Sequence, residues 1–389
     1  MRADALAQPL PGGGRRFTAP RDRPRAVARL RRIALVAGIA AILPALFSYV
    51  GTISKPSNSA FGIRSVEWLR EHGAAGIVAS VENIYYQLTA PSKGGPALRS
   101  LPRVGYRGGS ASAAVSSEYT PPSVAPLISP ALPGEGVWRA ARASGQAHPP
   151  VLLATLRDQP EYPRTVVGLA WINTAQTQLT LNPGRVEPSI ELPRGAMEVP
   201  RERRARLLAT FNSGFKLSDD HSGYVLGGRT YAPMQNGQAT LVDYANGQVD
   251  VIDWRSGPVA PAGVSFARQN LPLIVDNGAP TANVTNTHAW GATVGNATLV
   301  WRSGVGVDRA GNLIYAAGND QTVSSLAGAL ARAGAVRAME LDINSYWVNF
   351  ITYAAPGAEG PANLLPDMER SASRYLEPDD RDFFAVYAR

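Results

Sequence analysis

Residues 322–342 read TVSSLAGALARAGAVRAMELD, and this stretch decides the type of fold that we predict. A cap at Thr322 or Ser324 and a glycine at Gly334 mark the two ends of a helix. Its apolar face consists of Leu326, Leu330 and Ala331. The apolar run after Gly334 predicts a strand that delivers Asp342. The stretch therefore predicts a helix packed on a β-sheet, with a carboxylate where a strand ends.

Short apolar runs before this stretch predict further strands. Such runs are found at residues 151–156, 166–172 and 207–211. The second run is almost continuously apolar, which is typical of a central strand. Asn246-Gly247 lies between two strand-like runs and is typical of a tight hairpin. We predict an α+β fold for residues 136–389, a strand-rich mixed sheet with one prominent packed helix.

Three motifs join apolar, strand-like runs to polar turns. They are Phe211-Asn212-Ser213-Gly214-Phe215-Lys216, Trp301-Arg302-Ser303-Gly304-Val305-Gly306 and Glu340-Leu341-Asp342-Ile343-Asn344-Ser345. Gly and Asn favour such turns because they tolerate positive φ. We expect Asn212, Arg302 and Asp342, each at the end of a buried strand, to converge on one pocket. Because an Arg beside backbone amides binds anions, the motifs predict a phosphate-recognising hydrolytic site.

The positive charge of the chain is concentrated at its N-terminus. Residues 1–32 hold nine Arg against Asp4 and Asp22, which accounts for nearly all of the formal net charge of +8. The rest of the chain is almost neutral and shows no basic stripe, so we predict no nucleic-acid partner. Cys is absent, which excludes disulfides, thiolate zinc sites and Cys nucleophiles.

An uncharged apolar segment follows the basic tail at residues 33–54. Its length suits a helix that spans a bilayer, in which Pro44 is tolerated as a kink. The positive-inside rule then predicts a single-pass membrane protein with residues 1–32 in the cytoplasm and the C-terminal domain outside it. The helix would contact membrane lipid. A cleaved signal peptide and a buried soluble helix are the alternatives.

The segment between this helix and the strand-rich domain has two parts. In residues 55–89 the apolar residues recur at spacings of three and four, which predicts a juxtamembrane helical segment. Gly73 and Gly76 are the points where this helix is expected to be weak. It either lies on the bilayer as an amphipathic helix or packs on the following domain. Residues 90–135 are rich in Pro, Gly, Ser and Ala, which predicts a flexible linker.

The order of the three motifs resembles the phosphodiester glycosidase family, whose usual forms are N-G-G-F-F, R-T-A-I-G and L-D-G-G-G-S. The matching segments here are Asn212–Lys216, Arg302–Gly306 and Leu341–Ser345. The resemblance implies a membrane-anchored extracytoplasmic hydrolase of glycosyl phosphodiester or related glycosidic bonds in envelope polysaccharide, with a carbohydrate or sugar-phosphate polymer as substrate and no cofactor.

The chain departs from the family's pattern in the first and third motifs. Ile343 and Asn344 stand where the family has glycines, and Lys216 replaces an aromatic residue. A nest of backbone amides that approaches a phosphate favours glycine. The alternative is therefore a non-catalytic polysaccharide-binding module on the same fold, and a third hypothesis is a structural anchor of the envelope.

We assign the candidate residues different roles. Arg302 would hold two phosphoryl oxygens, Asp342 would transfer a proton or attack, and Asn212 would position the sugar. Glu340 shares a strand face with Asp342 and is a candidate second acid, and Trp347 is a candidate for stacking on a sugar ring. The substrate-binding candidates are Ser213, Gly214, Lys216, Gly306, Asp276, Asn344 and Ser345. We predict no metal site.

Overall fold

The computed structural model describes residues 23–105, 120–141, 148–290, 298–354 and 357–389. Most of the predicted basic tail and part of the predicted linker therefore lie outside the described residues. The chain divides into two compact units, Met1–Lys55 and Pro56–Arg389. The second unit holds all three motifs.

The first unit contains helix α1 (Arg23–Ile53), which includes Pro44. Its segment Val27–Ile53 is long and apolar enough to cross a membrane. The segment lies near the N-terminus, and a signal sequence at that position has a similar length and apolar composition. The orientation across a membrane stays a prediction.

The second unit begins with a helical segment that is broken once. Helix α2 (Phe61–Leu69) leads through a π-helical turn, η1 (Arg70–Ala74), into helix α3 (Ala75–Thr89). Gly73 has a φ of +88°, so the break falls at one of the two predicted weak points. Arg70 pairs with Glu82 across this break.

The helical segment packs on the strand-rich domain, which was one of the two alternatives for it. Just before α2, the Asn58 side chain donates to Asp379 Oδ2 at 2.9 Å and the Ala60 amide donates to the Tyr346 hydroxyl at 2.6 Å. In α3, Tyr86 packs on Val300 and Ile343. One face of α3 remains exposed.

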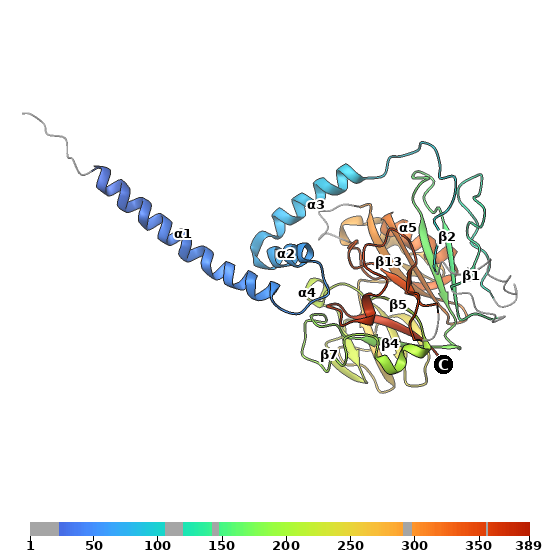
Figure 1. Ribbon diagram of the computed structural model, residues 1–389. Coiled ribbons are helices and arrows are strands. Elements are labelled where there is room, and N and C mark those ends of the chain that lie inside the picture. The colour runs from blue at the N-terminus through green and yellow to red at the C-terminus, as the bar shows by residue number, and fades with distance from the viewer. Residues whose placement is uncertain (1–22, 106–119, 142–147, 291–297, 355–356) are drawn as a thin grey trace, which may run out of the picture. The chain divides into compact units, whose positions relative to one another are not determined.

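In the described residues the strands form three antiparallel sheets (Figure 1). The first has the order β1 (Arg139–Ala140), β2 (Val151–Leu156), β3 (Val167–Ile172), β14 (Leu313–Gln321), β13 (Val300–Asp308), β15 (Ala335–Glu340), β11 (Val275–Asp276), β12 (Ala279–Pro280). The second has the order β7 (Arg229–Ala232), β6 (Tyr224–Leu226), β10 (Val264–Gln269), β8 (Ala239–Tyr244), β9 (Val249–Asp253). The third has the order β17 (Ala362–Asn363), β16 (Phe350–Thr352), β5 (Leu207–Asn212), β18 (Phe383–Ala388), β4 (Thr177–Asn182).

Short helices connect these strands. They are η2 (Arg201–Arg206), α4 (Leu217–Asp220), η3 (Ala282–Thr285), η4 (Thr287–Trp290), α5 (Val323–Arg332) and η5 (Arg374–Leu376). The sheet assignments confirm the predicted α+β class, and the pairing of β8 with β9 confirms the hairpin at Asn246-Gly247.

The first sheet is buried on both faces. One face packs against the other two sheets, through Val305, Tyr315 and Phe211 among others, and the opposite face packs against α5 through Leu326 and Leu330. The predicted cap of α5 is confirmed: Thr322 Oγ1 accepts from the Ser325 amide at 3.0 Å, in a reciprocal capping box. Gly334 follows the helix with a φ of +105°.

The predicted turn at Arg302 is wrong, because residues 302–306 lie inside β13. The glycines of this motif allow a close approach of β15 rather than a turn. A Cβ on Gly306 would lie 2.6 Å from the Arg337 carbonyl oxygen, and one on Gly304 would lie 2.8 Å from that of Met339. Gly therefore stands here because no side chain fits between the two strands.

Candidate active site

Asp342 follows β15 by two residues and is almost completely buried. Its Oδ1 accepts from the backbone amides of Ile343 and Asn344 at 2.8 and 3.0 Å, which is the geometry of an Asx turn. Its Oδ2 lies 3.1 Å from Arg381 Nη2. The carboxylate is therefore held in one orientation by its own turn and by a guanidinium.

The three motifs do meet, through Ser303 rather than Arg302. The Asn212 side chain donates to Ser303 Oγ at 3.0 Å, and Ser303 Oγ donates to the Asp342 carbonyl oxygen at 3.0 Å. Asn212 Oδ1 accepts from the Tyr315 hydroxyl and the Asn349 amide, at 2.9 and 3.0 Å. Since its side chain is engaged on both ends, Asn212 is suited to positioning Asp342 rather than to binding a sugar.

Arg302 points away from this network, because neighbouring residues of a strand face opposite sides of the sheet. Its Nη1 forms an ion pair with Glu340 Oε1 at 2.6 Å, and both side chains are at most 1% exposed. Its Nε and Nη1 also donate to the carbonyl oxygens of Gln321 and Trp290, at 3.0 and 2.7 Å. The geometry does not support Arg302 as an anion clamp or Glu340 as a second acid.

A cavity of about 330 Å³ opens beside Asp342. Asn344, Trp347 and Arg381 line it around the carboxylate, and Phe215 and Lys216 line it from the first motif. Helix α2 and η1 supply Glu67, Arg70 and Glu71 to another part of the wall, and α4 supplies Ser218 and Asp219. Of the predicted site residues, Asp342, Lys216 and Asn344 therefore share one cavity.

Asp342 and Lys216, two of the charged residues around this cavity, have partners of opposite charge in its lining. Burial raises the pKa of Asp342, while Arg381 and the two turn amides oppose this shift. Lys216 Nζ lies 3.1 Å from Glu67 Oε1 and 3.8 Å from Glu71 Oε1. An anion that binds to Lys216 would have to compete with these carboxylates. The site thus combines a carboxyl whose pKa is raised with three cationic side chains, those of Arg70, Lys216 and Arg381.

Trp347 lines the cavity, as expected for a residue that contacts a ligand, but its ring is already in contact with cations. The guanidinium of Arg381 lies 5.0 Å from the ring centroid and that of Arg374 lies 5.1 Å from it. The indole is 3% exposed. Its position therefore favours a role in holding Arg381 next to Asp342 over stacking on a sugar ring.

The other predicted substrate-binding residues lie outside the cavity lining. Gly214 is adjacent, since its carbonyl oxygen accepts from Arg381 Nη2 at 2.9 Å. Asp276 is exposed, and its carboxylate accepts from the amide and the side chain of Asn277 in its own turn. The remaining three, which are not part of this lining, are Ser213, Gly306 and Ser345.

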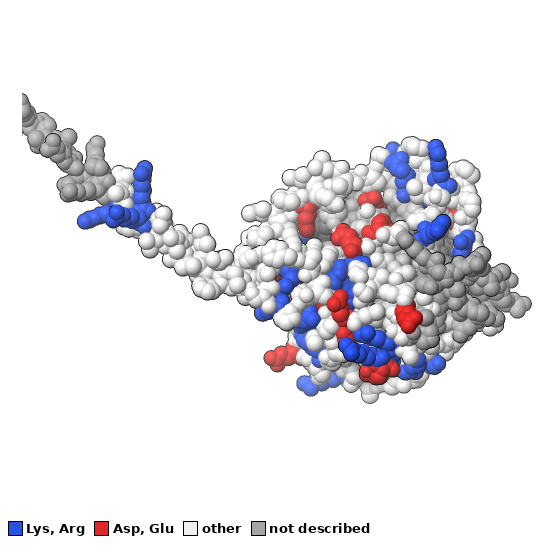
Figure 2. Space-filling model, in the orientation of Figure 1, with Lys and Arg blue, Asp and Glu red and all other residues white. Residues whose placement is uncertain are grey.

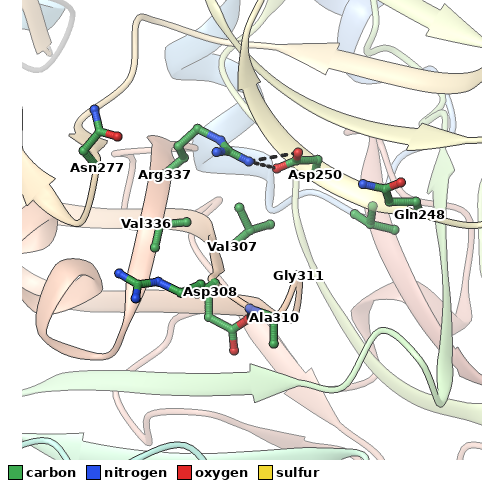
Figure 3. Close-up of a pocket in the computed structure, with 11 residues that line it drawn as sticks. Gln248, Asp250, Asn277, Val307, Asp308, Ala310, Gly311, Val336 and Arg337 are labelled. Atoms are coloured by element: carbon green, nitrogen blue, oxygen red, sulfur yellow. Dashed lines mark hydrogen bonds and ion pairs between the residues drawn. The ribbon is translucent and has the colours of Figure 1, made fainter.

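Figure 3 shows another cavity, of about 490 Å³, at the ends of β9, β13 and β15. Arg337 points at Asp250 there and forms an ion pair at 2.6 Å, with a second contact at 2.9 Å. The Asp308 carboxylate accepts from the Ala310 and Asn312 amides, both at 2.9 Å. The cavity beside Asp342 is the better candidate for chemistry, because its wall holds an almost completely buried carboxyl with a raised pKa.

Sequence reasoning missed Arg381, the residue that touches Asp342. It lies in the run Asp379-Asp380-Arg381-Asp382, which resembles an exposed charged turn. All four residues are buried, each with a partner of opposite charge. Asp379 pairs with Arg374, Asp380 with Arg185, Arg381 with Asp342, and Asp382 with Arg268. The only local signal is that the run directly precedes an apolar strand.

Across the described residues, no group of three or more His, Asp or Glu side chains is arranged to hold a metal ion. What the arrangement offers is proton transfer by a carboxyl and charge stabilisation by a guanidinium.

Comparisons with known proteins give distant structural similarities. No family model and no curated protein matches the chain. The catalytic domain of zebrafish N-acetylglucosamine-1-phosphodiester alpha-N-acetylglucosaminidase, auto-inhibited by its pro-peptide, is 15% identical with a TM-score of 0.41, over 65% of this chain and 87% of that one. A hypothetical protein from Synechocystis is 14% identical with a TM-score of 0.37, over 64% and 65%. An exported protein from Burkholderia pseudomallei is 13% identical with a TM-score of 0.30, over 59% and 75%. Similarity at this level does not assign the chain to a family.

Proposed function

We propose that the chain is a membrane-anchored extracytoplasmic hydrolase of glycosyl phosphodiester or related glycosidic bonds, with Asp342 and Arg381 as its reactive pair. The observation that carries the proposal is a buried carboxyl with a raised pKa, 3.1 Å from a guanidinium, in the wall of a cavity. Arg381 would hold a phosphoryl oxygen, and Asp342 would give or take the proton. The order of the three motifs supports the same chemistry.

Lys216 would add a second cation next to the substrate. Its side chain is 19% exposed and its partners Glu67 and Glu71 belong to the helical segment, so the substrate would displace at least one of these contacts. Asn212 and Ser303 would keep the Asp342 turn in place from behind. No protein ligand set for a metal enters this scheme.

The test is hydrolysis of a panel of sugar 1-phosphodiesters by the full-length protein in detergent micelles, with released sugar and phosphomonoester as the two readouts. Asp342→Asn keeps the volume of the side chain and should reduce the rate about 10²- to 10⁴-fold, the usual contribution of a general acid or base. Asp276→Asn is the matched control, because Asp276 is exposed and lies outside the cavity lining. Equal activity of the two variants would exclude Asp342 from the reaction.

One observation favours the alternative of a polysaccharide-binding module without activity. Ile343, which stands where the resemblance leads us to expect a glycine, is 2% exposed and packs with Val300 and Tyr86. The turn after Asp342 is therefore closed by a side chain on the side of α3. Binding of polymer without turnover, unchanged in Asp342→Asn, would support this alternative.

A further inference from the structure

Helix α3 presents large aliphatic side chains to the outside, although another of its faces already packs on the protein. The inward face consists of Val78, Ala79, Glu82, Asn83 and Tyr86. The outward face carries Ile77, Val81, Ile84 and Leu88, whose side chains are between 59% and 82% exposed. A helix at the surface of a water-soluble domain carries polar and charged residues on its outward face instead. The outward face therefore needs an apolar partner.

These four residues, which we call the α3 stripe, follow the spacing of one helical face. Intervals of four, three and four residues place them in a line along the helix. Tyr85, which is 60% exposed, lies next to the stripe. The one charged residue of α3 is Glu82, which pairs with Arg70 on the other side. In Figure 2 the surface around α3, at the upper left of the second unit, is mostly white.

The chain itself indicates what covers the stripe. Helix α1 contains the candidate membrane span and ends at Ile53, and α2 begins at Phe61. The seven residues between them can extend over at most about 25 Å. If α1 crosses a bilayer, the start of α2 therefore lies within about this distance of the point where the chain leaves the membrane.

We propose that the α3 stripe lies in the interfacial region of the lipid bilayer. The proposal rests on the membrane placement of α1 and is independent of the chemistry at Asp342. An uncharged aliphatic stripe flanked by a tyrosine suits the boundary between headgroups and acyl chains. Because η1, which leads into α3, supplies Arg70 and Glu71 to the cavity lining, the cavity would open near the membrane, where a lipid-linked glycosyl phosphate could reach it.

The test uses the full-length protein, which has no Cys, so that one introduced Cys can carry a fluorescent label. Val81→Cys is labelled with an environment-sensitive nitrobenzoxadiazole dye, and the protein is reconstituted in phosphatidylcholine–phosphatidylglycerol vesicles. Val259→Cys is the matched control, since Val259 is 67% exposed and lies between β9 and β10. We expect lipids with an acyl-chain spin label to quench the dye at position 81 several-fold more than at position 259.

A third label, at Val36→Cys in α1, separates the two parts of the proposal. Quenching at position 36 but equal, weak quenching at positions 81 and 259 would overturn the placement of the stripe while leaving α1 in the membrane. Weak quenching at all three positions would overturn both. Protection of position 81 from lipid-borne and aqueous quenchers, rising with protein density in the vesicles, would identify a second copy of the chain as the partner and would also overturn the proposal.

Discussion

Two arginine–carboxylate pairs, whose carboxylates Glu340 and Asp342 lie close together in sequence, differ in their access to solvent. In the first pair, Arg302 Nη1 lies 2.6 Å from Glu340 Oε1, and the two side chains are 1% and 0% exposed. In the second pair, Arg381 Nη2 lies 3.1 Å from Asp342 Oδ2, and the two side chains are 8% and 6% exposed. Burial raises the pKa of both carboxyls, and the partner guanidinium opposes each shift. One pair is sealed inside the sheet and the other lines a cavity. A guanidinium and a carboxylate can therefore stabilise the fold where they are sealed from solvent, and they can meet a substrate where they line a cavity.

The largest effect that would test this comparison is on stability, in Arg302→Ala. Removing one partner of a buried pair leaves an uncompensated charge, so we expect a loss of about 3–5 kcal/mol in the free energy of unfolding. The measurement is denaturant unfolding of the full-length protein in micelles, followed by Trp fluorescence. The double variant Arg302→Met/Glu340→Leu should recover most of the loss, because apolar residues of similar size replace such pairs at little cost. If the Arg302→Ala protein were as stable as the wild type but inactive, Arg302 would have a role in the reaction rather than in stability.

A smaller effect, on activity, is expected for Arg381→Gln. Asp342 keeps its two turn amides and gains access to water in the cavity, so the protein should remain folded. Loss of a charged hydrogen bond to a phosphoryl group should lower kcat/KM about 10- to 100-fold. Arg337→Gln, which breaks the ion pair of the other cavity, is the matched control and should leave hydrolysis unchanged. Similar losses in both variants would mean that Arg381 has no special place in the reaction.

A third buried carboxyl, that of Asp158, has the side-chain amide of Gln321 as its hydrogen-bond partner instead of a guanidinium. Its Oδ1 accepts from Gln321 Nε2 at 3.3 Å, and burial raises its pKa to about 7 although Arg332 opposes the shift. The folded protein therefore holds a proton that the unfolded chain, with an ordinary Asp pKa, releases at lower pH.

The stability contributed by Asp158 should consequently fall as the pH rises from about 4 to about 7. Asp158→Asn removes this titration, so its stability relative to the wild type should increase over that window and then level off. Unfolding free energies at a series of pH values provide the measurement. Parallel pH profiles for the two proteins would contradict the pKa shift.

Much of the fold follows from local signals in the sequence. The capping pattern at Thr322 and Gly334, the turn at Asn246-Gly247 and the continuous apolar runs depend on residues that are neighbours in the chain, and the structure confirms each of them. Arg302 was misplaced because glycines in a strand resemble those of a turn. Their purpose is visible only against β15, which belongs to a later part of the chain.

The sequence by itself determined the α+β class, the helix on the sheet, the apolar N-terminal segment and the arrival of Asp342 at the end of a strand. These properties depend on periodicity, capping and turn preferences, which act over a few residues. Tertiary structure alone decided which arginine stands beside that carboxylate. It also turned the charged run at 379–382 inward and the aliphatic α3 stripe outward. Burial of these charges depends on partners such as Arg185, Arg268 and Asp342, which lie in other elements of the chain, so no local pattern records it.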